Sequence, residues 1–530
     1  MTTCLSHEEI PLRALDLAII AVFLVGMPLL GILIGGRQRS ANDYFVSEKK
    51  ISWWVVCLSV VSAETSTLTV LSVPTVAYLA KPEAGGMTFL SLAIGYLLGR
   101  IVVSFVLLPR YIAGDLVTAY NFLGKRFGAG LQGTASVTFL CTRLLADGVR
   151  LFATAIPVKV VLAAYGVQVD YWVIVLLLGA AMVVYSFFGG ARAVVWVDAI
   201  QMLWYVLGAA IVIVVLTDRL PGDWFSQAAD ANKFQLFDFS SSPLTSPYAI
   251  LTALIGGAVL SMASHGADQL IVQRLMATKD VKASQKALIG SGVVVFFQFA
   301  LFLFIGVLLW SFYKAANPTK DLGLGTNDEL FAYFIVNELP SGLSGFVIAG
   351  ILAAALSSSL GALASSTVTD VYEKVSRRTL SDAERLRHGR VWTVIWAGVL
   401  VVFASMFTTT KNPIVETGLT ITGYTYGALL GAFLLGLLVK RAKQLDAIIA
   451  FVVTVAVMAF VILGVKFTKT GELIGIDFSK SAGTALAFPW YTPLGVLITL
   501  MIGGLLALRH PSPAPDLDDP QDASTAAKAA

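Results

Sequence analysis

The sequence predicts an all-α integral membrane protein with about thirteen transmembrane helices. Of its 530 residues, 57% are hydrophobic and only 13% are charged, whereas soluble domains typically carry about 25% charged residues. The apolar residues recur along the whole chain in runs of the length that a helix needs to cross a bilayer. Both observations disfavour a soluble domain with a single membrane anchor.

Thirteen segments have the length and composition of transmembrane spans, and we number them 0 to 12. They lie at about 14–36, 52–80, 87–109, 134–164, 170–188, 194–217, 248–272, 286–312, 340–372, 391–409, 415–439, 445–465 and 488–508. The connections 218–247 and 313–338 contain Trp, Phe, Gly and Pro and are expected to form short interfacial helices. The tail from His510 is rich in Pro, Asp and Ala, a composition typical of disorder.

The distribution of basic residues predicts the orientation, because basic loops are retained in the cytoplasm. One set of alternate loops carries Arg37, Arg39, Lys49, Lys50, Lys125, Arg126, Arg274, Lys279, Lys282, Lys374, Arg377, Arg378, Arg385, Arg387, Arg390, Lys440, Arg441 and Lys443. The opposite loops are longer and carry fewer basic residues. We therefore expect a multi-pass protein of the cell membrane, with its N-terminus outside and its C-terminus in the cytoplasm.

Several other classes of protein are disfavoured by composition and motifs. A net charge of +4, spread over short loops, does not suggest a nucleic-acid partner. The three cysteines, Cys4, Cys57 and Cys141, are odd in number and lack CxxC spacing, which disfavours a disulfide framework or a cysteine metal site. The motifs HExxH, GxSxG and GxxxxGK[ST] are absent from the sequence, so neither an enzyme nor an ATP-driven pump is predicted.

Spans 1 and 6 contain polar residues at bilayer depth, where lipid offers no hydrogen-bond partners. In span 1 these are Ser62, Glu64, Thr65, Ser66, Thr67 and Thr69, and in span 6 they are Ser261, Ser264, His265, Asp268 and Gln269, after Gly256 and Gly257. The two spans lie five helices apart, so a repeated five-helix unit would enter from the opposite membrane face. Paired interrupted helices in inverted repeats predict a transporter binding site. The alternative is two ordinary polar helices in a large bundle.

Span 8 adds three consecutive serines, Ser357, Ser358 and Ser359, to a run of small residues that begins at Gly350. Small residues allow close packing of helices, which is one explanation of the run. Packing alone needs no hydroxyl groups, however, and hydroxyl and carbonyl oxygens are the ligands that a hard cation such as Na⁺ prefers. The run is therefore a candidate sodium site.

Four motifs together resemble the solute:sodium symporter family, over about residues 10 to 510. They are Phe187 to Gln201 with the sequence FFGGARAVVWVDAIQ, Gly266 to Arg274 with GADQLIVQR, Gly350 to Tyr372, and Gly423 to Gly436. Members of that family carry sugars, sialic acid, proline, pantothenate or iodide together with sodium. The resemblance implies a LeuT-like fold of two inverted five-helix repeats, with one additional N-terminal helix and two C-terminal helices.

The implied organisation has six parts. These are residues 1–51 with span 0, the first repeat 52–217, an outer loop 218–247, the second repeat 248–440, spans 11 and 12 in 441–508, and a cytoplasmic tail 509–530. The resemblance also implies a sodium site where span 1 meets span 8. Its expected ligands are backbone carbonyls of Ser62, Thr65 and Ala355 and hydroxyls of Ser358 and Ser359.

Some family members bind a second sodium ion through hydroxyls that follow these serines, together with the aspartate of span 5. This sequence has Gly361 and Ala362 at the hydroxyl positions but keeps Asp198. We therefore expect one sodium ion per solute, with Asp198 as a possible second cation or proton site.

The solute is less well defined by the sequence. Sugar-carrying relatives have an aromatic pair where this chain has Ser264 and His265, and Ser66 and Thr69 are more similar to relatives that take sialic acid or small acids. The candidate solute ligands are Glu64, Ser66, Thr69, Arg143, Arg150, Ser261 and His265. His265 is interpreted as a polar cavity residue, with a proton relay as the alternative.

Span 3 carries Arg143, Asp147 and Arg150 on one helix face. Pairing Arg143 with Asp147 leaves Arg150 without a counter-ion, unless Glu64 of span 1 reaches it. Either an arginine binds a carboxylate of the solute, or the four charges form a structural network. Arg100 in span 2 is expected to pair or to extend to the membrane surface.

The sequence thus predicts sodium-coupled uptake of a small organic solute, for example an organic anion such as sialic acid or another carboxylate. The alternatives are a sodium/sugar symporter and a proton-coupled carrier that uses Asp198, Glu64 or His265. The expected partners are the solute, the coupling Na⁺ and the bilayer, and no obligate protein partner is evident.

Overall fold

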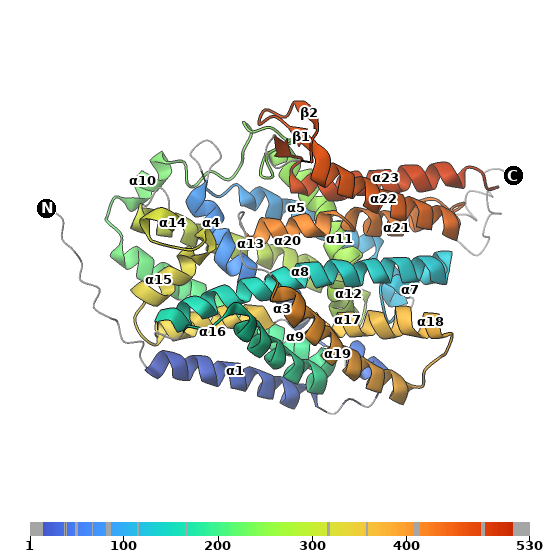
Figure 1. The fold of residues 1–530 in the computed structure, drawn as a ribbon, viewed down its shortest axis with the longest axis horizontal. Helices are drawn as coiled ribbons and strands as arrows, with labels where there is room; N and C mark the ends of the chain where they lie inside the picture. The colour runs from blue at the N-terminus through green and yellow to red at the C-terminus, as the bar shows by residue number, and fades with distance from the viewer. Residues whose placement is uncertain are drawn as a thin grey trace.

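The computed structural model describes residues 14–511 apart from 37, 39, 48–50, 66, 81–85, 114–115, 165–167, 315–317, 357–358, 407–413 and 479–482. It is a bundle of long helices that run mainly along one axis, with α1 at one edge and α21 to α23 at the other (Figure 1). Ser66, Ser357 and Ser358 lie outside the described residues, as does the predicted disordered tail from residue 512 onward.

In the described part of the first half of the chain, the regular elements are helices joined by turns and loops. Its helices are α1 (Ala14–Gly35), α2 (Ala41–Phe45), α3 (Trp53–Glu64), α4 (Thr67–Leu79), α5 (Phe89–Val106), α6 (Leu108–Ala113), α7 (Tyr120–Phe127), α8 (Ala129–Ala164), α9 (Tyr171–Arg219) and α10 (Trp224–Asp230). The predicted spans 4 and 5 are both part of α9, which bends at Gly190, where φ is 59° and ψ is −167°. This left-handed backbone conformation favours glycine.

The second half contains shorter helices and three strands. Its helices begin with η1 (Thr252–Gly256), α11 (Gly257–Gly266), α12 (Gln269–Met276), α13 (Val281–Tyr313), α14 (Pro318–Asp321), η2 (Asn327–Glu329), α15 (Leu330–Glu338), α16 (Leu343–Leu356) and α17 (Leu360–Ser366). They continue with η3 (Thr367–Tyr372), α18 (Glu373–Ser376), α19 (Asp382–Ala404), α20 (Ile414–Gly423), α21 (Tyr426–Leu438), α22 (Gln444–Gly464), η4 (Phe488–Trp490) and α23 (Tyr491–Ala507). Short helices thus lie in both predicted outer loops.

The all-α prediction needs one correction, because a small antiparallel sheet with the order β2-β1-β3 lies between α22 and α23. Its strands are β1 (Val465–Phe467), β2 (Leu473–Ile476) and β3 (Thr484–Ala485). Gly471, with φ of 94°, closes the turn between β1 and β2. The amide of Thr468 also donates to the carbonyl of Glu472 across this turn. A glycine turn between two short apolar runs is a hairpin signal.

Among the described residues, eight helices are long and apolar enough to cross a membrane, or nine when the bent pair α3 and α4 counts as one span. The protein is therefore a mostly helical, multi-pass membrane protein. Several of the thirteen predicted spans appear in the structure as pairs of shorter helices, because the chain leaves helical geometry in their middle. Such halves do not reach the length of a spanning helix by themselves.

The helix breaks occur where polar residues interrupt the apolar runs. The axes of α3 and α4 differ by 61°, and Thr65 between them is extended, with φ of −77° and ψ of 104°. The chain breaks again between α11 and α12, where Asp268 is extended and its side chain accepts from the amide of Leu270. The predicted interruptions of spans 1 and 6 are thus confirmed. Gly256 and Gly257, in contrast, stay helical, at the end of a π-helical turn.

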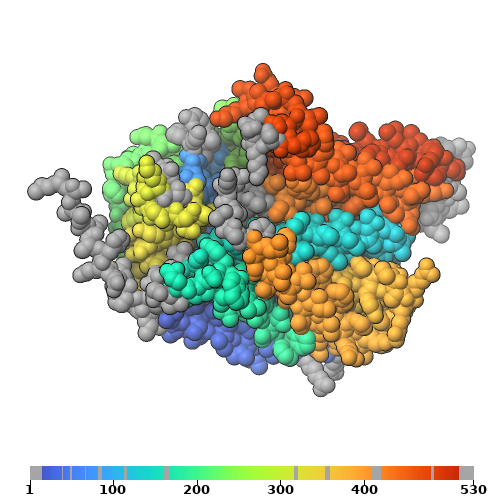
Figure 2. Space-filling model, in the orientation of Figure 1, coloured from blue at the N-terminus to red at the C-terminus, as the bar shows by residue number. Residues whose placement is uncertain are grey.

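The core of the bundle is formed by helices that are far apart in sequence. Helix α5 packs against α11 so closely that a Cβ atom at Gly99 would lie 2.1 Å from the carbonyl oxygen of Ala258. Helix α8 lies between the α19 region and α22, as the space-filling view shows (Figure 2). This arrangement directs polar side chains of α3, α5, α8 and α11 towards one another.

Candidate functional site

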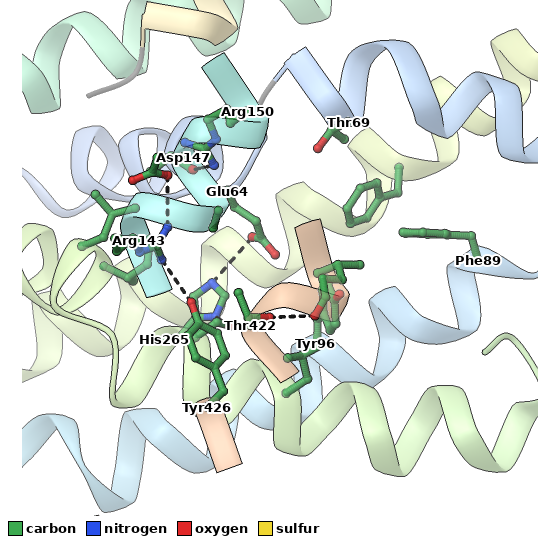
Figure 3. Close-up of a pocket in the computed structure, with 18 residues that line it drawn as sticks. Glu64, Thr69, Phe89, Tyr96, Arg143, Asp147, Arg150, His265, Thr422 and Tyr426 are labelled. Carbon is green, nitrogen blue, oxygen red and sulfur yellow. Dashed lines mark hydrogen bonds and ion pairs between the residues drawn. The ribbon is translucent and has the colours of Figure 1, made fainter. Parts of the chain in front are cut away.

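A cavity of about 150 Å³ lies where α3, α4, α5, α8, α11, α20 and α21 meet. Charged residues gather on one side of it, among them Glu64, Arg143, Asp147 and Arg150 (Figure 3). The other side is formed by Phe89 and Tyr96 of α5 and by Thr69 of α4 (Figure 3). The cavity therefore offers both ionic and aromatic contacts to a small molecule.

Glu64 ends α3 at the cavity wall and forms an ion pair with Arg100 of α5. Arg100 is fully buried, and its Nη1 also donates to Ser291 Oγ at 2.8 Å. Of the two sequence-based expectations for Arg100, pairing is therefore the one that the structure supports. The Glu64 side chain remains 18% exposed, so the paired carboxylate still faces the cavity.

His265, near the end of α11, lies beside the same Glu64 oxygen that pairs with Arg100. Its Nε2 is 3.6 Å from the Glu64 carboxylate, and its Nδ1 is 2.8 Å from Ser264 Oγ. Both His265 and Ser264 line the cavity. Ser261, which the sequence placed among the solute ligands, is turned away instead, because its hydroxyl donates to the carbonyl of Tyr96 at 2.9 Å. Ser264 thus replaces Ser261 as a cavity residue.

Arg143 links three elements at the edge of the cavity. Its Nε donates to Asp268 Oδ2 at 3.1 Å, and its Nη2 donates to Tyr426 Oη at 3.1 Å. Tyr426 in turn donates to the same Asp268 oxygen at 2.6 Å. Asp147, the partner expected from the i, i+4 spacing, is farther away, at 3.6 Å. In the sequence, Asp268 was marked by the interruption of span 6 and Tyr426 by the motif from Gly423 to Gly436. Neither residue was predicted as a solute ligand.

Arg150 has a different environment. Its Nη2 donates to the carbonyl of Ala63 at 2.8 Å, and the side chain lines the cavity. Within the described part of the chain, no carboxylate lies within ion-pair distance of its guanidinium. Glu64 is directed to Arg100 and His265. The alternative in which Glu64 reaches Arg150 is therefore not the one seen in the structure. The four charges do not form one network.

The candidate sodium ligands of α3 lie at its broken end. Ser62 and Thr65 are buried, and Ser62 Oγ has no hydrogen-bond partner in the described structure. Because Thr65 is extended, the local backbone carbonyls are released from helical hydrogen bonds. Thr67 Oγ1 lies 3.4 Å from the carbonyl of Ile351 in α16, which places the break of span 1 beside span 8. The released carbonyls and the unpaired hydroxyl fit a hard cation.

On the span 8 side, Ala355 belongs to the last turn of α16, and Ser359 is buried immediately before α17. Ser66 and Ser358 lie outside the described residues, so their placement stays a prediction. Asp198, the possible second cation site, is fully buried. It accepts hydrogen bonds from Arg274 at 2.9 Å and from Ser59 at 3.1 Å. The positive charge beside Asp198 is therefore already supplied by Arg274.

These features define an α-helical membrane transporter, with broken helices around a central cavity. Residues 44–454 match the Sodium:solute symporter family, and the chain belongs to this family. It is thus a sodium-coupled solute symporter and not an enzyme. In this class Na⁺ is a co-transported ion rather than a resident cofactor.

Three curated relatives match over almost the whole length of this chain. The sodium/sialic acid symporter of Aliivibrio fischeri is 28% identical over 497 residues, which are 92% of this chain and 91% of that protein. The sodium/sialic acid symporter of Proteus mirabilis is 25% identical over 520 residues, which are 95% of this chain and 97% of that protein. The sodium/iodide cotransporter of Homo sapiens is 25% identical over 96% of this chain and 78% of its own length.

Two solved structures share the fold. A sodium-coupled sialic acid symporter in a substrate-bound, outward-open state has a TM-score of 0.78 and 24% identity, and the match covers 94% of this chain and 98% of that one. Mhp1, a transporter of the nucleobase-cation-symport-1 family, has a TM-score of 0.54 and 11% identity, with 88% and 94% covered. Both are LeuT-fold transporters, so the fold implied by the four sequence motifs is supported by structural likeness.

Proposed function

We propose that this chain couples the sodium gradient to the uptake of a small organic anion, such as sialic acid or another carboxylate, by alternating access. The observation that carries the proposal is Arg150. Its guanidinium lies at the cavity wall, and among the described residues it lacks a carboxylate partner. Arginine binds a carboxylate through two parallel hydrogen bonds, and such charge-assisted bonds are stronger than neutral ones. The sialic acid symporters among its relatives support this class of solute.

The architecture that we propose for this activity has about thirteen spans. Two inverted five-helix repeats, 52–217 and 248–440, contribute one broken helix each, and span 0 precedes them while spans 11 and 12 follow. The N-terminus is outside and the C-terminus is cytoplasmic. The breaks at Thr65 and at Asp268 support this arrangement, because interrupted helices in matching positions are typical of transporter binding sites.

In this proposal, one sodium ion binds where α3 ends and α17 begins. Backbone carbonyls of Ser62, Thr65 and Ala355 and hydroxyls of Ser358 and Ser359 are its ligands. The ion supplies the driving force, since moving one charge through 100 mV releases about 2.3 kcal/mol. Replacing Ser359 by alanine removes one oxygen and keeps the small volume, so it should weaken sodium activation without unfolding the protein.

The test is uptake by proteoliposomes at fixed pH, with sodium on the outside or replaced by choline. Sialic acid, short monocarboxylates and neutral sugars are offered as solutes. We expect uptake of an acid only with sodium, and sodium should raise the melting temperature of the purified protein. Uptake that persists in choline and follows a proton gradient would instead favour the proton-coupled alternative. Sodium-dependent uptake of sugars alone would favour a sodium/sugar symporter.

A further inference from the structure

The carboxylate of Glu64 has one oxygen that no protein group binds among the described residues. The ion pair with Arg100 and the contact with His265 both involve Oε2, and within the described part of the chain no hydrogen bond reaches Oε1. The side chain is 18% exposed, and Figure 3 shows its carboxylate directed into the space between the charged residues and Tyr96. Oε1 is therefore a free acceptor at the cavity wall.

His265 presents a second acceptor beside this carboxylate. Its Nδ1 lies 3.2 Å from the carbonyl oxygen of Ser261, and a carbonyl oxygen only accepts hydrogen bonds. A neutral ring that donates from Nδ1 leaves Nε2 as an acceptor, 3.6 Å from Glu64 Oε2. In the described structure this nitrogen is buried and has no hydrogen-bond partner. Because natural proteins contain few unpaired buried polar atoms, these two acceptors indicate that a bound molecule supplies the donor.

The guanidinium of Arg150 lies next to these acceptors. Its Nη2 donates to the carbonyl of Ala63 at 2.8 Å, and Ala63 directly precedes Glu64 at the end of α3. A solute whose carboxylate binds Arg150 therefore has Glu64 within reach of a neighbouring group. The rings of Phe89 and Phe299, with centroids 5.0 Å apart, form an apolar part of the wall. The volume of about 150 Å³ suits a small solute, since drug-sized ligands occupy pockets of about 300–1,000 Å³.

We propose that Glu64 selects carboxylates that carry a hydrogen-bond donor on the carbon next to the carboxyl group. A hydroxyl or an ammonium group at this carbon donates to Glu64 Oε1, with His265 Nε2 as the second acceptor. An acid with only C–H bonds there would displace water from the Glu64 carboxylate without replacing its hydrogen bond, which is unfavourable. This inference rests on the proposed function, in which Arg150 binds the carboxylate, and adds a specificity-determining residue to it.

The experiment compares propionate, lactate and alanine, which differ only in the substituent at this carbon. The substituent is a hydrogen atom, a hydroxyl group or an ammonium group. Binding to the purified wild-type protein is measured by calorimetry at saturating sodium. We expect lactate, alanine or both to bind at least about tenfold more tightly than propionate, and the two probes distinguish a hydroxyl from an ammonium group. Propionate binding that is as tight as that of the other two acids would overturn the proposal.

The double variant Glu64→Leu with Arg100→Met tests the acceptor itself. It removes both charges of the buried ion pair, so no arginine is left unpaired. Replacing a buried ion pair by apolar residues of similar size is often neutral or stabilising. The advantage of the preferred acid over propionate should disappear, while the affinity for propionate should be unchanged. An equal loss of affinity for all three acids would instead identify Glu64 as a structural residue and overturn the proposal.

Glu373→Leu with Arg385→Met is the matched control, because it removes an ion pair of the same kind. Arg385 Nε lies 2.6 Å from Glu373 Oε1, and neither residue is among those that line the cavity. This control should keep the wild-type ratio of affinities for the three acids. If the Glu64 variant does not fold, His265→Phe is the second test, because it removes Nε2 and keeps a ring. It should reduce the same advantage, and an unchanged advantage would overturn the proposal.

The inference and the proposed function fail in different ways. Sodium-dependent uptake of sialic acid, combined with no preference for lactate or alanine over propionate, would overturn only the selectivity assigned to Glu64. The same uptake with none of the three acids bound would also overturn only this inference. If no acid is taken up with sodium, the proposed function itself is contradicted.

Discussion

Arg150 and Arg143 lie on the same face of α8, yet their surroundings differ. Arg143 is bound by Asp268, Tyr426 and Asp147. Arg150 donates to the carbonyl of Ala63 and faces the cavity. A buried charge in an ion pair mainly secures structure, whereas a cavity-wall charge that forms no ion pair among the described residues is available to a ligand. We therefore assign different roles to the two arginines.

Arg150→Lys should lower the affinity for an anionic solute about tenfold to a hundredfold, because a lysine cannot reproduce two parallel hydrogen bonds to a carboxylate. Sodium-induced thermal stabilisation should be nearly unchanged. Binding can be measured by calorimetry on purified protein at saturating sodium. Arg219→Lys, at the exposed end of α9, is the control. Equal affinities for the acid in both variants would contradict the ligand role of Arg150.

Arg143→Met should act on stability instead. It leaves the buried carboxylates of Asp268 and Asp147 without their arginine, and breaking a buried pair costs about 3–5 kcal/mol. The folded yield and the melting temperature of the variant should fall, whichever solute is present. Adding Asp268→Asn removes one stranded charge and should recover part of the loss. A variant that is fully stable but selectively defective for anions would show that Arg143 is a solute ligand.

At the scale of elements, the second half of the first broken helix, α4, is fixed by a lysine from the connection between α10 and η1. The buried ammonium of Lys233 donates to the carbonyls of Ala77, Tyr78 and Ala80 at 3.3, 2.9 and 2.6 Å, at the end of α4. It also lies 5.1 Å from the centre of the Trp310 ring. A cation at a helix C-terminus is stabilising. Since α4 also carries Thr69, this lysine cap holds one wall of the cavity.

Burial lowers the pKa of Lys233 from 10.5 to about 8. The charged cap is present below this pKa and is lost as the pH rises through it. Uptake should therefore decline between about pH 7 and 9, and Lys233→Met should lack this alkaline decline. Above the folded-state pKa the unfolded chain binds the additional proton, so global stability should not fall over this range. An alkaline decline that is identical in Lys233→Met would exclude the lysine.

At the scale of the whole molecule, the described breaks after α3 and after α11 lie within one packed assembly. In this assembly α9 contacts α3, α16 and α17. Movement of one proposed repeat against the other would therefore change the cavity and the proposed sodium site together. This coupling of sites is what a symporter requires, because the ion and the solute must cross in the same cycle.

The expected ratio of sodium to solute depends on whether a second sodium ion binds near Asp198. Gly361 and Ala362 supply no side-chain oxygen, and Arg274 already binds Asp198. We expect one sodium ion per solute. Reversal potentials measured in proteoliposomes with imposed sodium and solute gradients give the ratio directly. A ratio near two would contradict this expectation and return Asp198 to the list of ion ligands.

The sequence by itself determined the membrane class, the approximate positions of the long apolar helices and the interruptions of spans 1 and 6. These properties are local, because hydropathy, glycine and polar interruptions act within one segment. It also placed Glu64, His265, Arg143 and Arg150 together, since each lies at bilayer depth, where polar groups need a partner.

Only the tertiary structure decided which acidic and basic side chains form ion pairs. Glu64 pairs with Arg100 rather than Arg150, Arg143 pairs with Asp268, and Ser261 turns away from the cavity. Ion pairing depends on distances between helices that are up to 125 residues apart in the chain. Spacing along one helix does not contain that information.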